Sequence, residues 1–313
     1  MLPIAMTTGA SSYILYHSIP SIHCIGPALN EIVSFLQPTL IFAMLFLTFC
    51  RIEPRDLKPH RWHWWLLLIQ GGVFTVLGLI ASWLIRVLPA DSASAVVLIE
   101  SAMMCFICPT ATAAAVVVRK LGGDVPGIVT YIILINVLTA FLVPMIVPLV
   151  HPVDNFDFWM SFSLIISKVF PLLIMPCLAA WLVRYLFPKV HRRLLKYPDL
   201  AFYIWAFALA LAIAVTTKSI MASEMGLGLL LLIALISLIS CAVQFSLGRY
   251  IGSRYRSSEV TAGQSIGQKN TVFAIWMSYT FMTKETAIVG GLYSVWHNIY
   301  NSWQLYKAGK SSK

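Results

Sequence analysis

The chain has 313 residues, of which 59% are hydrophobic and only 11% carry a charge, and its mean hydropathy is +0.83. Soluble domains carry about 25% charged residues, so this composition excludes a soluble globular protein and indicates a chain that crosses a lipid bilayer several times. The sequence contains no phosphate-binding glycine loop, no paired zinc-ligand motif and no serine-nucleophile signature. We therefore expect neither an enzyme nor a bound cofactor.

Apolar runs of about 20 residues, the length that spans a bilayer, predict ten transmembrane helices. In chain order they cover residues 2–19, 31–50, 63–87, 93–118, 126–150, 157–187, 199–217, 225–248, 259–282 and 286–306. The first run contains several polar residues, but it lacks the basic start of a signal peptide, so we count it as a helix. The prediction is thus an all-α membrane protein.

Basic residues lie mostly on one side of this predicted topology. Only Arg86, Lys218 and Lys284 fall in segments of the opposite side, and Lys168 and Lys269 fall within spans. Because segments rich in lysine and arginine stay in the cytoplasm, the pattern predicts that both termini are cytoplasmic. The net charge of +10 is therefore a signal of orientation and does not indicate nucleic-acid binding.

Ten spans divide into two halves of five, residues 1–150 and 151–313. An odd number of spans per half places the second half upside down relative to the first, as in many secondary transporters. The fourth span contains Cys108-Pro-Thr-Ala-Thr112, where proline lacks an N–H, and the ninth contains the polar run 263–270. We predict that both helices break and cross at mid-membrane, where half-helix ends offer N–H groups to an anion.

Lys269 is a charged residue where a spanning helix is normally apolar. If the ninth span enters the membrane near Thr261, Lys269 lies about 12 Å along it, too deep for its amine to reach water easily. A charge near the bilayer centre costs about 2.5–3.5 kcal/mol on insertion scales, so the side chain should face a cavity or a partner. Glu100, inside an apolar run, is the natural partner, although it lies more than two turns before the break. A structural role and a proton-carrying role remain open for Glu100.

Several motifs together resemble the bile acid:sodium symporter family over nearly the whole chain. The segment Gly291-Leu-Tyr-Ser-Val-Trp-His-Asn-Ile299 is similar to the family's last helix almost letter for letter. Ile266-Gly-Gln-Lys-Asn270 lies where the family has its Glu-x-Gly-x-Gln-Asn motif. Further matches are Cys108-Pro109, Thr112, Gly122-Gly-Asp124, Gln70 and Lys168.

The resemblance implies a transporter of organic anions such as bile acids, steroid conjugates, pantoate or 2-oxo acids, which sodium usually drives. It also implies a core domain of spans 3–5 and 8–10 and a panel domain of spans 1, 2, 6 and 7. Relative motion of the two domains would give alternating access across a bacterial inner membrane. The expected partners are a small organic anion and the bilayer, while a monomer and a homodimer both remain open.

The chain departs from the family at the positions that hold sodium. There the resemblance places Ala114, Ala115, Ile128 and Ile132, none of which offers a side-chain oxygen to a hard cation. Ser265 replaces the family's glutamate and Lys269 a glutamine, so we predict no metal site and interpret Lys269 as a built-in cation that replaces sodium. The predicted cation site consists of Gln70, Ser265, Gln268, Lys269 and Glu100.

The predicted substrate-binding residues are Thr110, Thr112, Asn270, Thr271, His297 and Asn298. His297 and Asn298 match a family segment near the substrate, although such polar groups also form hydrogen bonds between helices. Two alternatives to sodium-independent transport remain open: a membrane ligand sensor that no longer transports, and a proton-coupled anion transporter that uses Lys269 or Glu100.

Overall fold

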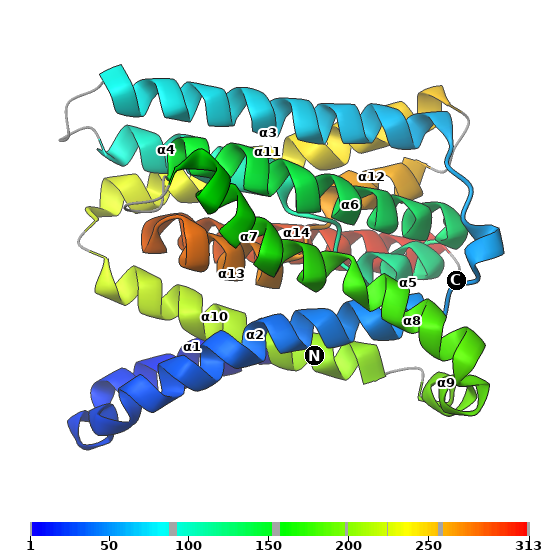
Figure 1. Cartoon of the computed structure of the whole chain (residues 1–313), viewed down its shortest axis with the longest axis horizontal. Helices are drawn as coiled ribbons and strands as arrows, with labels where there is room; N and C mark the ends of the chain where they lie inside the picture. The colour runs from blue at the N-terminus through cyan, green and yellow to red at the C-terminus, as the bar shows by residue number, and fades with distance from the viewer. Residues whose placement is uncertain are drawn as a thin grey trace.

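The computed structural model describes residues 2–87, 93–151, 157–197, 200–223, 225–255 and 259–311, and these ranges are helical almost throughout (Figure 1). The short 3-10 helices are η1 (Pro20–Ile25) and η2 (Pro54–Asp56). The α-helices are α1 (Leu2–Ser18), α2 (Gly26–Phe49), α3 (Arg61–Val87), α4 (Ala93–Ile107), α5 (Ala113–Lys120), α6 (Val125–Val150), α7 (Phe158–Leu173), α8 (Met175–Leu186), α9 (Pro188–Leu195), α10 (Leu200–Ala222), α11 (Leu227–Arg254), α12 (Glu259–Gly267), α13 (Thr271–Phe281) and α14 (Lys284–Ser311). The prediction of an all-helical chain is confirmed.

Within the described ranges, six helical segments are long and apolar enough to cross a membrane, so the protein is a multi-pass membrane protein. They are His23–Phe49, Arg61–Val87, Val125–Val150, Phe158–Leu186, Tyr203–Ala222 and Leu227–Arg254. The remaining predicted spans coincide with α1, with the pair α4 and α5, with the pair α12 and α13, and with α14. The arrangement as two inverted halves remains a prediction.

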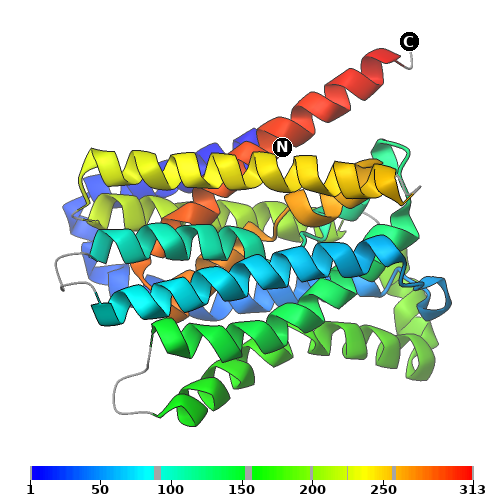
Figure 2. The ribbon, with the colours of Figure 1, turned by 90° about the horizontal axis from the view of Figure 1, so that it is seen from above.

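Two predicted spans differ from the observed helices. The run 157–187 is divided, because α7 ends at Leu173 and α8 starts at Met175, where Pro176 in the first turn has no N–H to continue the helix. The last predicted span, 286–306, is part of a longer helix, α14, which extends beyond the other helices at the C-terminal end (Figure 2).

The helices form two groups in the view of Figure 1, where α1, α2 and α10 lie along one side and α3, α11 and α12 along the other. Helix α1 packs against α10, and α2 packs against both α10 and α8. On the other side, α4 packs against α3, α11 and α14. These contacts place α4 inside the second group, with half of its described residues buried.

Small residues bring α12 close to α11. A Cβ atom added to Gly248 of α11 would lie 2.5 Å from the carbonyl oxygen of Ala262, and one added to Gly267 of α12 would lie 2.5 Å from the ring of Phe245. Such close approach of two backbones is typical of helix packing in membranes. The glycines therefore fix the position of α12, and with it the break that follows.

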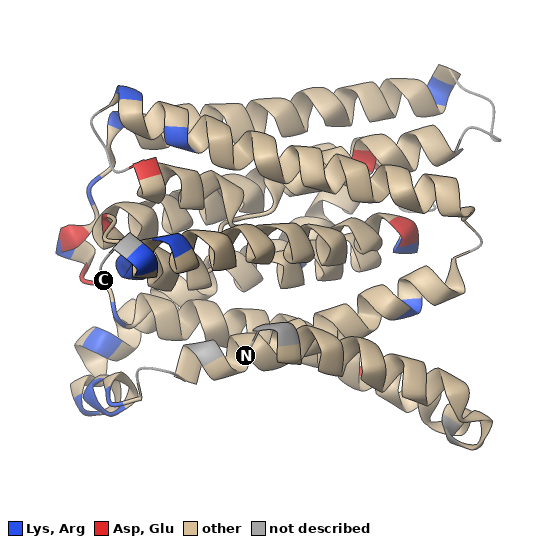
Figure 3. Cartoon of the chain, turned by 180° about the vertical axis from the view of Figure 1, so that it is seen from behind, with Lys and Arg blue, Asp and Glu red and all other residues tan. Residues whose placement is uncertain are grey.

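Lysine and arginine gather at one end of the bundle, as Figure 3 shows. This basic end, as we name it, contains the C-terminal ends of α2, α5 and α11 and the short helix α9 with Arg192 and Arg193. Arg86 lies in the last turn of α3 and Lys284 at the start of α14, both at the opposite end. The charge asymmetry expected from the sequence is thus present in three dimensions.

Candidate functional site

The breaks between α4 and α5 and between α12 and α13 contact each other. Thr110 and Lys269 form an antiparallel bridge. On either side of it, the Ala111 N–H donates to Gln268 O at 2.9 Å and the Asn270 N–H donates to Pro109 O at 2.7 Å. The Thr110 hydroxyl also donates to the carbonyl oxygen of Ser265. Because non-helical backbone at membrane depth must be satisfied by protein or water, the two breaks stabilise each other.

Lys269 lies at the carbonyl end of α4. Its side chain is 2% exposed, and its Nζ donates to Phe106 O at 3.0 Å. Gln70 of α3 donates to the same oxygen through Nε2 at 2.6 Å. Since the last carbonyls of a helix have no intrahelical partner and carry partial negative charge, the ammonium is placed where a cation is stabilised.

Side chains from other helices satisfy the neighbouring carbonyls of α4. Gln244 of α11 donates to Cys105 O at 3.1 Å, and Thr139 of α6 donates to Ile107 O at 3.1 Å. Tyr293 of α14 lies beside them, and its hydroxyl donates to Gly267 O at 2.9 Å. The carbonyl end of α4 is therefore held by side chains of α3, α6 and α11 in addition to Lys269.

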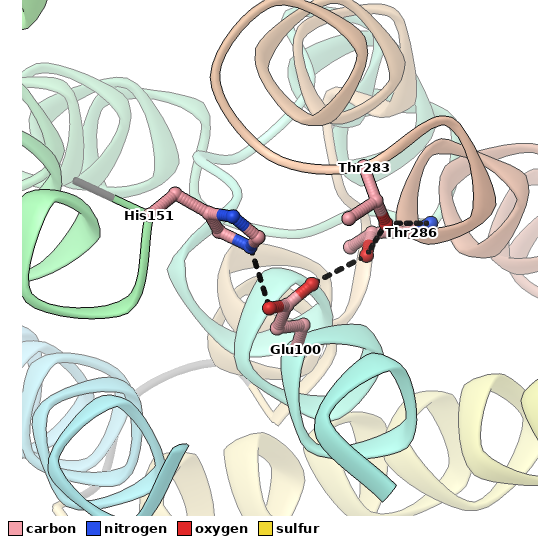
Figure 4. A network of polar contacts seen from close by, with 4 residues as sticks. All are labelled: Glu100, His151, Thr283 and Thr286. Carbon is pink, nitrogen blue, oxygen red and sulfur yellow. Dashed lines mark hydrogen bonds and ion pairs between the residues drawn. The ribbon is translucent and has the colours of Figure 1, made fainter. Parts of the chain in front are cut away.

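Lys269 has no carboxylate partner among the residues that the structure describes. Glu100, its expected partner, instead accepts hydrogen bonds from His151 and Thr286 (Figure 4). A small void beside the lysine is bordered by Cys105, Cys108, Thr271 and Tyr293 among others. In the described part of the chain, Lys269 thus contacts a backbone carbonyl and not an acidic side chain.

The other predicted members of the cation site have mixed surroundings. The Oε1 atom of Gln70 accepts from the hydroxyl of Tyr131, so this oxygen is already engaged within the protein. Ser265 is fully buried and donates to Thr261 O at 2.8 Å. The buried Oε1 of Gln268 has no partner in the described part of the chain. Ala114, Ile128 and Ile132 are fully buried and offer no oxygen, and Ala115 is partly buried.

The predicted substrate residues divide into two sets. Thr110, Thr112, Asn270 and Thr271 lie at or next to the crossed breaks. Asn270 caps α13, because its Oδ1 accepts from Phe273 N at 3.3 Å.

His297 and Asn298 lie farther along α14. The ring of His297 packs edge-on against Tyr293, with the ring centroids 5.7 Å apart, and Asn298 donates to Ser294 Oγ at 3.3 Å. The structure therefore connects this pair to the breaks through Tyr293.

A large cavity lies at the end opposite the basic end. It has a volume of about 760 Å³ and is bordered by α1, α2, α10 and α13. Lys168 and Lys218 line it together with tyrosines such as Tyr279, and no acidic residue is among the lining residues that the structure describes. Lys218 Nζ donates to Asn30 Oδ1 at 2.6 Å, and Lys168 lies over the ring of Phe281 at 5.6 Å. The cavity is thus amphipathic and cationic.

A second cavity of about 300 Å³ lies at the basic end. Its lining includes Thr112 and Ala113 at the start of α5, as well as Arg51, Arg119 and Lys120. Again no acidic residue is among the lining residues. The two cavities therefore lie near opposite ends of α2 and α10, and each borders one half of an interrupted helix pair, α13 or α5.

Sequence analysis missed several residues that organise the site. Gln244, Tyr131 and Tyr293 hold the breaks but were not predicted, although Gln244 is a polar residue inside an otherwise apolar run. A set formed by Gln264 of α12 and by Asn301 and Gln304 of α14 was also missed, in which Gln264 donates to Asn301 at 2.8 Å and to Gln304 at 2.7 Å. A systematic search for amide side chains within spans would have found the glutamines and the asparagine of these sets, but not the two tyrosines.

Comparison with known families agrees with the motifs. The model of the sodium bile acid symporter family matches residues 38–223, more than half of the chain, so the protein belongs to this family. No curated protein matches the chain. Membership in this family supports a membrane transporter with a small-molecule substrate.

Proposed function

We propose that this member of the sodium bile acid symporter family is a secondary transporter that moves an organic anion by alternating access without sodium. The observation that carries the proposal is Lys269, whose buried Nζ lies 3.0 Å from Phe106 O at the carbonyl end of α4. An ammonium in that position supplies the positive charge that a bound cation would otherwise supply at the end of a half-helix.

Electrostatic repulsion supports sodium independence. A second cation about 4 Å from the ammonium, in surroundings of effective dielectric near 20, would meet roughly 4 kcal/mol of repulsion. Such a penalty lowers affinity nearly a thousandfold. The apolar side chains of Ala114, Ile128 and Ile132 provide no oxygen ligands that could offset it.

The chemistry of the two cavities supports an organic anion as substrate. Basic side chains line both cavities without an acidic residue among the lining residues, and the larger one also has apolar and tyrosine walls. Its volume of about 760 Å³ lies in the range of sites that enclose a small organic molecule. An amphipathic carboxylate, of bile acid, steroid conjugate, pantoate or oxo-acid type, fits these walls better than a cation or a sugar.

The positions of the cavities support alternating access. They lie at opposite ends of α2 and α10. Helix α13, which follows one break, borders the larger cavity, and α5, which follows the other break, borders the smaller one. In the proposed division, α1, α2, α7, α8 and α10 form the panel, and α3 to α6 with α11 to α14 form the core. The first half is residues 1–150, and both termini are cytoplasmic, in agreement with the basic end.

Ligand screening followed by uptake tests this function. Purified protein is heated with a series of carboxylates, their methyl esters and amines of similar size, and stabilisation by the free carboxylates alone is expected. A stabilising carboxylate should then accumulate in proteoliposomes. If only neutral or cationic compounds stabilise the protein, the anion proposal is wrong; carboxylate binding without uptake would identify a membrane ligand sensor.

A second candidate is proton-coupled anion transport through Lys269 or Glu100. It is favoured by the fully buried carboxylate of Glu100, which contacts a partly exposed histidine. Uptake that rises steeply with an imposed proton gradient in the absence of sodium would favour this candidate. Uptake that responds only to the gradient of the anion itself would exclude it.

A further inference from the structure

Glu100 is a carboxylate inside the helical bundle whose two oxygens both accept hydrogen bonds (Figure 4). Oε1 accepts from His151 Nε2 at 2.6 Å, and Oε2 accepts from the Thr286 hydroxyl at 2.7 Å. The hydroxyls of Thr283 and Thr286 lie 2.7 Å apart and share a further hydrogen bond. Each oxygen of the carboxyl group therefore has a hydrogen-bond donor from the protein.

The three partners come from different helices. Glu100 lies in α4, Thr286 in the first turn of α14, and His151 immediately after α6. The backbone N–H of His151 donates to Val147 O at 2.8 Å. The residue therefore lies at the carbonyl end of α6, where a positive charge is favourable. Its side chain is 26% exposed, whereas that of Glu100 is 0% exposed. His151 is therefore the member of the pair that solvent contacts directly.

Other charged groups on the surrounding helices do not pair with these residues in the part of the chain that the structure describes. Helix α11, which packs on α4, carries its charges at the basic end, and α13 has no charged residue. The Asp157 carboxylate is engaged in capping α7. The charged groups toward this end include Arg86 on α3, Lys284 and Glu285 on α14, Asp157 just before α7, and Lys168 and Lys218, which line the large cavity.

We propose that Glu100 and His151 form a proton-binding site, open to the end of the molecule opposite the basic end. In the unloaded state the neutral imidazole donates its Nε2 hydrogen to Glu100. A proton from water then adds to Nδ1, which is not the atom that faces Glu100 in Figure 4, and the neutral–anionic contact becomes an ion pair. Release of the proton from Nδ1 restores the first state, so no other reactant is required.

Proton binding at this site stabilises the contact of α4 with α6 and α14. A buried carboxylate that faces an imidazolium is more stable than one that faces only neutral donors, because neutral donors leave its negative charge uncompensated. The same α4 carries Phe106 at its other end, so the site connects protonation to the helix that Lys269 caps. The proposal goes beyond anion transport, and it holds whether or not the protein moves an anion.

The test uses the full chain in detergent without any anionic ligand, so its outcome is independent of the proposed transport. Thermal unfolding is measured between about pH 5.5 and 8, the range in which histidine titrates. The protein should lose several degrees of melting temperature as pH rises, and His151→Gln, which retains a donor but cannot gain a proton, should lose this dependence. The control is His60→Gln, which changes an exposed histidine just before α3. This variant should retain the pH dependence of the melting temperature.

A spectroscopic measurement separates proton binding from a purely structural role. In nitrogen-15-histidine NMR spectra, the signal that disappears in His151→Gln should change from the protonated to the neutral form within this range. Thr286→Val removes one donor and should lower stability at every pH while the pH dependence persists. If the His151 signal stays neutral throughout, or His151→Gln shows the same pH dependence as the unsubstituted protein, the proposal is wrong.

Discussion

The Nζ atom of Lys269 lies 3.0 Å from the carbonyl oxygen of Phe106, so the break after α12 places a cation at the carbonyl end of α4. Two helices that are distant in the sequence are thereby joined through one side chain. The lysine is enclosed, with 2% of it exposed, and no described carboxylate pairs with it. Burial of the lysine destabilises the folded protein, and its proposed function is to place a positive charge near the bound anion.

Replacing Lys269 by glutamine should weaken anion binding at least about tenfold, equivalent to about 1.4 kcal/mol. Glutamine can still donate a hydrogen bond toward Phe106 O but carries no charge, so the substitution removes mainly the electrostatic contribution. Affinity is measured by calorimetry with a carboxylate from the screen. The control is Lys310→Gln, which removes a charge from an exposed position near the end of α14. Equal affinities for both variants would contradict a role of Lys269 in binding.

The melting temperature of Lys269→Gln should stay within a few degrees of the unsubstituted protein. Removing a buried ammonium relieves its desolvation cost, which offsets the lost hydrogen bond. A large loss of both stability and binding would instead indicate that Lys269 acts only as a structural cap of α4.

Gln70→Leu should destabilise the protein by about 1–3 kcal/mol, because it leaves the buried Tyr131 hydroxyl without its acceptor. Chemical denaturation in detergent measures this change. The double substitution Gln70→Leu with Tyr131→Phe removes both partners and should recover part of the loss. No recovery would show that Tyr131 is not the relevant partner of Gln70.

Lys168→Gln and Lys218→Gln should each lower the affinity for a carboxylate about two- to fivefold, the size expected for a partly solvated charge pair. Both side chains line the cavity of about 760 Å³, where the proposed anion would meet their positive charge. Binding of the corresponding methyl ester should not change. Equal losses for the ester and the carboxylate would indicate altered cavity shape rather than lost charge.

Much of the fold could be predicted from hydrophobic runs and helix-breaking residues. The interruption near Pro109 follows from the missing N–H of proline, and the interruption near Lys269 from polar residues in an apolar run. The division of the run 157–187 was not predicted, because Pro171 is accommodated within α7 while Pro176 starts α8. Sequence position alone does not tell which proline ends a helix.

The site was less predictable, since it depends on partners from distant helices. Lys269 was singled out correctly as buried, whereas its contact with Glu100 was left open, and Glu100 instead contacts His151, 51 positions later in the chain. His151 follows an apolar run, where a polar residue is usually solvated, so nothing local indicates that it reaches back to α4. The polar contacts of Gln244 and Tyr293 likewise depend on which helices pack together, and the spacing of apolar residues along a helix does not specify that packing.

Sodium dependence of substrate affinity tests the central claim most directly. The dissociation constant of a stabilising carboxylate is measured for the unsubstituted protein in sodium chloride and in choline chloride at equal ionic strength and pH. If Lys269 replaces the sodium ion, the two constants should agree within about twofold, because a free cation near the ammonium would meet roughly 4 kcal/mol of repulsion. A strong requirement for sodium, with affinity lost in choline, would contradict the account.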